Sequence, residues 1–344
     1  MNAVIRPIAL HDLPAYIQCA KSANFGFTTL PRDPVLAEKR LHISLESFQK
    51  NVVTPGDEFY LFVAENIETG AIMGISAISA TTGGKDPLYF FRNESYSVSS
   101  QIDDIVRTIP ILTPVSYVRS SSEICSLFVL AEYQKLGFGR LLSFSRFLFM
   151  KAFMKRFTGT IFAELRGCVD ENLTSIFWNG VGRHFFTKSL YDVYDMLQYG
   201  KAFIAEFLPK YPIYTELLPE AVQESIGKND TDTQGALRLL TEIGFQKTSE
   251  VDVFDAGPKL SALKENISII KEAKIVQITD IKESIASPLY FASNMHIDFR
   301  ACMSHIAIKG DTVAEISRKT AKALSVGLGD SIIIYPMIYP RSVS

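Results

Sequence analysis

Two glycines stand directly before an apolar helical segment, in the run Gln134-Lys135-Leu136-Gly137-Phe138-Gly139. The first turn of a helix has backbone N–H groups without partners and a partial positive charge, so a tight turn there can bind an anion such as phosphate. Glycines let the backbone approach a ligand that a Cβ atom would obstruct. The same run would also serve a plain strand-to-helix connection. It is neither a Walker loop, since no Gly-Lys-Ser/Thr follows, nor a dinucleotide fingerprint, whose glycine spacing differs.

The histidines and cysteines show no arrangement suited to metal binding or covalent catalysis. The five histidines lack the spacing of a metal site, and we expect no metal. Cys125 and Cys168 lie on or beside apolar stretches, where inert buried thiols are expected. Four cysteines without close pairs, and an N-terminus without the layout of a signal peptide, favour a reducing cytoplasm.

The composition is that of a folded chain which binds small molecules. Of its 344 residues, 47% are hydrophobic and 21% are charged, which supports one large or two medium domains. The net charge of -2 and the absence of a basic patch give no indication of nucleic-acid or membrane binding. The most apolar helical segment, residues 141–157, contains four basic residues and is too short to span a bilayer, so we expect a buried core helix.

The elements around the glycine turn predict a mixed α/β sheet. A strand at residues 3–8 precedes two helices, the second over residues 34–50, and two apolar runs joined by Asn66–Gly70 predict a β-hairpin. After a less regular stretch over 82–119, an apolar strand at 121–133 leads into the turn and the buried helix. The pattern then gives a strand at 159–167, a helix at 171–182 and a strand near 183–186.

The helices and strands expected in the second half of the chain are shorter. A helix is expected around 233–245 and a strand at 248–255, followed by a break at Ala256-Gly257-Pro258. Residues 259–344 alternate short strands with one helix, and we place a domain boundary near residue 200.

Several long blocks carry a family resemblance. The turn after an apolar strand resembles the pyrophosphate loop of the GNAT acyltransferase superfamily, which binds coenzyme A thioesters. More specifically, the chain resembles the arginine N-succinyltransferase family nearly from end to end. The blocks that carry this resemblance are SSEICSLFV, LLSFSRFLFM, FAELRGCVDE, FWNGVGRHFF, KAFIAEFLPKYPIY, VDVFDAGP and FRA at 299–301.

The resemblance implies a fold, a reaction and partners. The fold would be a GNAT-type mixed sheet with flanking helices in an acyl-CoA-binding core at 1–200, with a smaller C-terminal α/β region at 201–344 that completes the substrate site. The α-amine of arginine would attack the thioester of succinyl-CoA directly, without a metal or a covalent enzyme intermediate. Succinyl-CoA and arginine are then the small-molecule partners, and the chain would act in a homo- or hetero-oligomer.

The resemblance also assigns the acyl-CoA site. A family leucine that contacts acyl-CoA matches Leu127, and the strand residues Leu127, Phe128 and Val129 would offer backbone groups to the pantetheine arm and the thioester oxygen. The diphosphate would lie on the turn. A core role for Leu127 is the alternative. The turn residues assigned to the cofactor are Gln134, Leu136, Gly137, Phe138, Gly139 and Arg140.

Two positions depart from the patterns of the relatives. The GNAT superfamily places a tyrosine that protonates the leaving thiolate where this chain has Trp178, and an indole cannot be that acid. The arginine N-succinyltransferase family places a proton-handling histidine where this chain has Asp230. An ordinary aspartate is ionised at neutral pH and can accept a proton but rarely donate one, so Asp230 is a candidate base. A helix cap is the alternative role.

The implied substrates require charged partners. The succinyl carboxylate calls for a cation, and Arg166 at the end of the strand is the first choice, with Arg92, Arg183 and Arg300 behind it. The arginine guanidinium calls for carboxylates, for which Glu164 and Asp170, with Glu171, are candidates at the same strand end. Glu164 and Arg166 share one face of a strand, so they could instead pair with each other.

Two other functions remain open. The chain could acylate another amine, such as ornithine or a polyamine. Since Trp178 and Asp230 replace expected proton handlers, it could also be a non-catalytic acyl-CoA binder or the inactive partner in a heteromer.

Overall fold

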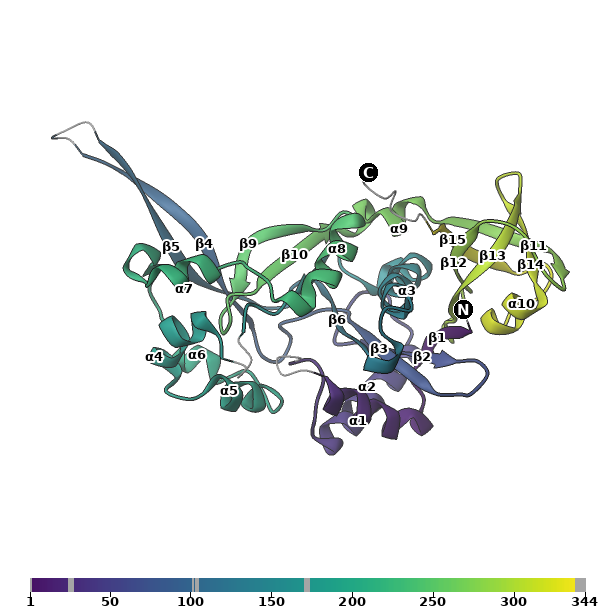
Figure 1. Cartoon of the computed structure of the whole chain (residues 1–344), viewed down its shortest axis with the longest axis horizontal. Coiled ribbons are helices and arrows are strands. Elements are labelled where there is room, and N and C mark those ends of the chain that lie inside the picture. Colours follow the sequence, from purple (N-terminus) through teal and green to yellow (C-terminus); the bar gives the residue numbers. More distant parts are fainter. Residues whose placement is uncertain (1, 24–27, 101, 103–104, 170–173, 338–344) are drawn as a thin grey trace.

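One long, mostly antiparallel sheet runs through an elongated molecule (Figure 1). The computed structural model describes residues 2–23, 28–100, 102, 105–169 and 174–337. The central part of the sheet has the order β1-β2-β3-β6-β7-β10-β9-β4-β5-β8. These strands are β1 (Ala3–Pro7), β2 (Phe59–Asn66), β3 (Ile72–Ser79), β6 (Ser122–Val129), β7 (Thr160–Glu164), β10 (Pro258–Leu263), β9 (Gln246–Asp252), β4 (Leu88–Ser99), β5 (Val106–Tyr117) and β8 (Ile213–Tyr214).

Helices cover both faces of the sheet at strands β1, β2, β3 and β6. Along β2, Tyr60 and Phe62 pack into one hydrophobic cluster with α3 (Phe138–Ala152), while Leu61 and Val63 pack into another with α1 (Leu13–Ser22) and α2 (Pro34–Gln49). This alternation follows from the period of two along a strand. It confirms the two N-terminal helices, the hairpin and the buried core helix that the sequence predicts.

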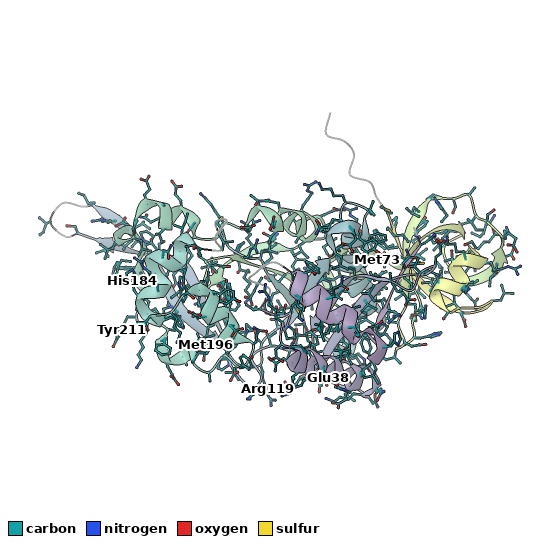
Figure 2. All side chains as sticks on the ribbon, turned by 60° about the horizontal axis from the view of Figure 1, so that its bottom comes forward. Glu38, Met73, Arg119, His184, Met196 and Tyr211 are labelled. Carbon is teal, nitrogen blue, oxygen red and sulfur yellow. The ribbon has the colours of Figure 1, made fainter. Side chains whose placement is uncertain are left out.

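A helical lobe covers the other end of the central sheet. It contains α4 (Arg183–Phe186), α5 (Leu190–Leu197), α6 (Ile204–Phe207) and α7 (Glu220–Ser225), and Figure 2 shows its residues His184, Met196 and Tyr211 at the end of the molecule away from the C-terminal strands. The strand predicted near 183–186 is wrong, because these residues form α4. Phe186 is buried there against Trp178 and Phe254, so packing in the lobe outweighs the local preference of a short aromatic run for strand.

A long two-stranded ribbon extends away from the sheet. Strands β4 and β5 pair from Leu88–Tyr117 to Ser99–Val106, and the ribbon is seen at the upper left of Figure 1. The less regular stretch predicted over 82–119 is therefore wrong for most of its length. The outer half of the ribbon is exposed, so its side chains do not show the alternation that marks a half-buried strand.

The C-terminal strands close into a small barrel. The order β12-β15-β11-β14-β13 is completed by pairing of β12 with β13. The barrel strands are β11 (Lys274–Lys282), β12 (Leu289–Ser293), β13 (Ala301–Lys309), β14 (Val313–Ser317) and β15 (Ser331–Pro336), with α10 (Arg318–Leu324) beside them and α9 (Ser268–Glu272) before them. The predicted helix around 233–245 is α8 (Gln234–Glu242). Strands from both sides of residue 200 pair in the central sheet, and the domain boundary there stays a prediction.

Candidate active site

Strands β6 and β7 separate shortly after they begin to pair. Their parallel pairing joins Ser122 to Ile161 and Glu123 to Phe162, and no later pair follows in the described part of these strands. Beyond that point the register between β6 and β3 shifts, and Ser126 adopts a φ of 53°. This is a β-bulge, a feature that redirects side chains and often lies beside active sites. The Ser126 hydroxyl donates to the Thr29 carbonyl at 3.3 Å and lies 3.0 Å from Thr29 Oγ1, which holds the bulge in place.

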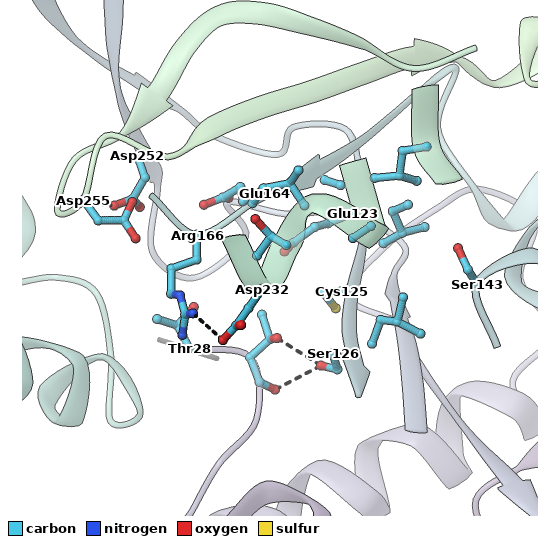
Figure 3. A pocket seen from close by; sticks show the side chains of 18 of the residues that line it. Thr28, Glu123, Cys125, Ser126, Ser143, Glu164, Arg166, Asp232, Asp252 and Asp255 are labelled. Carbon is cyan, nitrogen blue, oxygen red and sulfur yellow. Dashed lines mark hydrogen bonds and ion pairs between the residues drawn. The ribbon is translucent and has the colours of Figure 1, made fainter. Parts of the chain in front are cut away.

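A cavity of about 230 Å³ is lined by residues of both strands after they separate (Figure 3). The β6 residues Glu123 to Leu127 and the β7 segment from Ala163 to Arg166 form two of its walls. Helix α3, helix α8, the turn after β9 and Lys201 supply further lining residues. The cavity is thus assembled from segments far apart in the sequence.

The glycine turn has the geometry of an anion cradle. Gly137 is the residue before α3 and has a φ of 88°, and Lys135 has a φ of 62°, so the chain turns sharply into the helix. A Cβ atom on Gly139 would find Val129 Cγ2 at 3.9 Å as its nearest neighbour, so the approach to the first turn of α3 is open. The Gln134 amide donates to the Val129 carbonyl at 3.1 Å and fixes the turn to the end of β6.

The other residues predicted to bind acyl-CoA lie in different places: in the cavity lining, in the core or on the surface. Leu127 lines the cavity, whereas Phe128 packs on the opposite face of β6 toward α1 and α2. Phe138 is buried and packs edge-on against Tyr133, and Leu136 is exposed. Arg140 forms an ion pair with Glu242 and lies over the Phe144 ring.

Two carboxylates from the separated strands face the cavity. Glu123 comes from β6 and Glu164 from β7 (Figure 3), and neither has a hydrogen-bond or ion-pair partner among the described residues. Desolvation, and then the charge of Glu123, raises the pKa of Glu164 to about 7. Desolvation also raises the pKa of Glu123. Glu123 is half-buried and Glu164 is exposed at the cavity, so two neighbouring negative charges there favour a bound cation.

A second acidic pair lies beside them at the turn between β9 and β10. The Asp252 carboxyl accepts from the Phe254 N–H at 2.7 Å, and the buried Asp255 accepts from the Gly257 N–H at 2.8 Å and the Tyr194 hydroxyl at 3.1 Å. Burial raises the pKa of both carboxyls, and the neighbouring carboxylates raise that of Asp252 further.

Arg166 and Asp230, both predicted site residues, pair with each other. The Arg166 guanidinium donates to Asp230 at 2.9 Å and to Asp232 at 3.2 Å (Figure 3 draws the second of these). Asp230 also accepts from the Asp232 N–H at 2.9 Å, as the cap of the turn before α8. Burial opposes ionisation of Asp230, but the Asp232 N–H and Arg166 outweigh it and keep the pKa of this carboxyl below its usual value.

The remaining predicted residues lie elsewhere. Arg92 bonds to the Tyr117 hydroxyl and lies 3.8 Å from Glu250, and Arg300 donates to the Ala323 carbonyl at 3.3 Å. Trp178 is buried in the helical lobe against Phe186 and Phe254, away from the cavity lining. Asp170 and Glu171 lie outside the described residues.

Several residues that line the cavity were not predicted from the sequence. Glu123 carried a signal, since it is a charged residue inside an otherwise apolar strand. Arg146 stood out only as an interruption of an apolar helix, although it lines the cavity beside Ser143. Lys201, Tyr194, Asp252 and Asp255 carried no local signal, because tertiary packing alone brings them to the cavity.

The described residues contain neither a metal-binding cluster nor a membrane-spanning helix. No group of three or more His, Cys, Asp or Glu side chains in this part of the chain has an arrangement that could hold a metal ion. Among the same residues, no helix is both long and apolar enough to cross a membrane.

Comparisons with known proteins identify the family of the chain. A family model described as "Arginine N-succinyltransferase beta subunit" matches residues 3–269. The arginine N-succinyltransferase of Yersinia pestis is 32% identical over 347 residues, covering 98% of this chain and 99% of that protein. Arginine N-succinyltransferase subunit beta of Pseudomonas aeruginosa is 35% identical over 336 residues, covering 97% and 98%.

A solved structure agrees over the whole fold. The arginine/ornithine succinyltransferase subunit AI from Pseudomonas aeruginosa superposes with a TM-score of 0.88 at 31% identity, covering 97% of this chain and 98% of that chain. The predicted mixed α/β sheet with flanking helices and the predicted resemblance to the arginine N-succinyltransferase family are confirmed. The chain belongs to the arginine N-succinyltransferase family.

Proposed function

We propose that this protein transfers the succinyl group of succinyl-CoA to the α-amine of arginine, giving N2-succinylarginine and free coenzyme A. The observation that carries this proposal is the pair of unpartnered carboxylates, Glu123 and Glu164, in a cavity where two strands of a succinyltransferase fold separate. A dicationic amine fits such a site because its positive charges offset the repulsion between the two neighbouring carboxylates.

The thioester would follow the open edge of β6. Its diphosphate would lie on the first turn of α3 at Gly137 and Gly139, where the approach is open. The pantetheine arm would bond to backbone groups of β6 from Val129 toward Leu127, on the edge that β7 no longer covers. The thioester carbon would then lie near the bulge at Ser126, where an N–H group can polarise its oxygen.

The amine would enter from the side of the carboxylates. Glu123 and Glu164 would hold its positive charges, and Lys201 or Arg166 would meet the α-carboxylate. In this arrangement residues 201–344 complete the substrate site of a core formed by 1–200, since Lys201, Asp252 and Asp255 line the same cavity.

Direct transfer needs one proton acceptor. The bound α-ammonium first releases one proton to water; the amine nitrogen then forms a bond to the thioester carbon, the C–S bond breaks, the second amine proton passes to a base, and the thiolate takes a proton from water. Glu164 suits the base, because its pKa of about 7 lets it be ionised at working pH and still hold a proton well. Asp230 is the alternative base, but its depressed pKa makes it a weaker one.

The test is thiol release with a panel of substrates. Arginine, ornithine and spermidine are each assayed with succinyl-CoA and acetyl-CoA, and the product is identified by mass spectrometry. We expect turnover with arginine and succinyl-CoA, and a loss on the order of 100-fold or more in Glu164→Gln. Glu38→Gln, on the exposed face of α2, is the matched control and should behave as the parent. Turnover confined to another amine, or binding of coenzyme A without turnover, would overturn the proposal.

We also infer that the chain works in the cytoplasm as a subunit of an oligomer. The support is that two of the relatives are described as subunits. Light scattering of the purified protein, alone and with a candidate partner subunit, measures the mass that tests this.

A further inference from the structure

Arg146 is a buried cation that faces the cavity without an acidic partner. It is 3% exposed and lies on α3, and it lines the cavity together with Ser143. Its guanidinium donates to the Ser143 hydroxyl at 3.1 Å, the Ser143 carbonyl at 3.3 Å and the Cys125 carbonyl at 3.4 Å. Among the ion pairs of the described residues, Arg146 has none. We propose that Arg146 binds the terminal carboxylate of the succinyl group, and so selects a dicarboxylic acyl donor; this rests on the proposed function.

The burial of Arg146 is costly unless an anion joins it. A charge removed from water without a partner of opposite sign is strongly disfavoured, and neutral carbonyl and hydroxyl groups compensate only in part. Burial lowers the pKa of the Arg146 guanidinium to about 10, which reflects the same missing charge. A carboxylate is the anion that a guanidinium fork fits best, because it accepts two parallel N–H bonds.

Arg146 lies at the end of the cavity that is distant from the glycine turn. Arg146 lies eight residues beyond Phe138, which starts α3, so it is about 12 Å along the helix from the turn. Cys125, whose carbonyl it contacts, lies four residues from Val129, or about 13 Å along β6 from the same turn. Both routes lead from the diphosphate cradle to the bulge, where the thioester would lie and the acyl chain would begin.

The other two cations of the cavity are less suited to this task. Arg166 already pairs with Asp230 and Asp232. Lys201 lies on the side of the acidic residues, where its charge lowers the pKa of both Glu123 and Glu164. The cavity therefore has one cation on α3, while its carboxylates lie on β6, on β7 and at the β9–β10 turn. This polarity would keep the acyl carboxylate and the cationic amine at opposite sides of the reacting atoms.

The test compares two thioesters of equal chain length. Butyryl-CoA carries a methyl group where succinyl-CoA carries the carboxylate, so the ratio of their affinities isolates that group. Calorimetric titration without any amine should show that the parent binds succinyl-CoA more tightly, on the order of 100-fold. Arg146→Met should lose this preference while binding butyryl-CoA as the parent does, and Arg146→Lys should keep part of it. Thermal unfolding of each variant checks the fold, and removal of an unpaired buried charge should leave Arg146→Met at least as stable as the parent.

Two outcomes would overturn the inference. A variant that binds both thioesters equally weakly would show that Arg146 only supports the bulge through the Cys125 carbonyl. A variant that keeps the full preference for succinyl-CoA would show that another cation binds the carboxylate. These results are separate from the proposed function, which fails if the parent binds and discriminates the thioesters yet transfers nothing to arginine.

Discussion

The Arg166 guanidinium and the Asp230 carboxylate form an ion pair of 2.9 Å that joins the end of β7 to the segment before α8. Both side chains are about nine-tenths buried. The Asp230 N–H also donates to the Arg166 carbonyl at 2.9 Å, so main chain and side chain make the same connection. Asp230, the candidate base of the sequence analysis, is thus held as the partner of Arg166, which lines the cavity.

Asp230→Asn should reduce stability more than activity. Asparagine keeps the cap but loses the charged bond to Arg166, which is worth about 1.5–3 kcal/mol in typical cases. We expect urea unfolding to show a loss of this order, with a succinylation rate within a few-fold of the parent at neutral pH. A rate lowered 100-fold with unchanged stability would instead identify Asp230 as the base.

The pH dependence of the rate should follow Glu164. A base must be ionised to accept a proton, so kcat/KM for arginine should rise as the pH passes through about 7 and then level off. Glu164→Gln should lower kcat/KM and remove this rise, whereas Glu38→Gln should retain it. A rise near pH 7 that persists in Glu164→Gln would exclude Glu164 as the group that titrates.

Stability without ligand should change with pH in the opposite sense. The pKa of Glu164 is raised from its ordinary 4.5 to about 7, so between these values the folded protein holds a proton that the unfolded chain has released. The free energy of unfolding therefore falls as the pH rises through this window. Glutamine carries no such charge, so Glu164→Gln should match the parent near pH 4.5 and exceed its unfolding temperature above pH 7. A difference that does not vary with pH would contradict this origin.

Gly139→Ala should weaken thioester binding without harming the fold. The added Cβ meets only Val129 Cγ2 at 3.9 Å in the protein, but it projects into the approach to the first turn of α3. We expect the KM for succinyl-CoA to rise and the unfolding temperature to stay the same or increase. Gly235→Ala, in α8 with open space around it, is the matched control and should leave KM unchanged. Equal KM values for both variants would argue against the cradle.

Gly257→Ala should destabilise the acidic turn between β9 and β10. A Cβ there would clash with the Leu165 carbonyl and lie 2.9 Å from Asp255 Oδ1. A Cβ on Gly167 would likewise clash with the carbonyl of Asp255, in the same loop. We expect a loss of about 1–3 kcal/mol in urea unfolding, as for an overpacked core, together with reduced activity. Gly159→Ala has no neighbour within 4 Å and serves as the control. Parent-like stability of Gly257→Ala would show that the β9–β10 turn can move aside.

Elements with a clear apolar period were predictable from the sequence. The hairpin β2–β3 and helix α3 were found because their buried faces recur at the expected spacing. The ribbon β4–β5 was missed because its outer residues pair only with each other and face solvent, and Pro110 and Pro114 within β5 argue against a strand. Closure of the barrel depends on the pairing of β12 with β13, and no local sequence pattern predicts that pairing.

The site residues, like the elements of the fold, were predictable only where their sequence signal is local. The glycine turn was predictable because its chemistry is local to a few consecutive residues. The carboxylate cluster was only half found: Glu164 was proposed, while Glu123 and Asp252 reach it through strand pairing and a turn. The role of Arg146 could not be predicted, because a cation on an apolar helix indicates a binding site only once the cavity beside it is known.

The pairing of β7 with β10 has a consequence for folding of the chain during its synthesis. Strand β7 has its partner for Thr160–Glu164 in residues that the ribosome delivers only much later, at Pro258–Leu263. Until then the nascent chain carries an uncovered strand edge with apolar side chains, the kind of surface on which aggregation begins. A shortened gene product that stops near residue 200 would keep that edge permanently and would be expected to depend on chaperones.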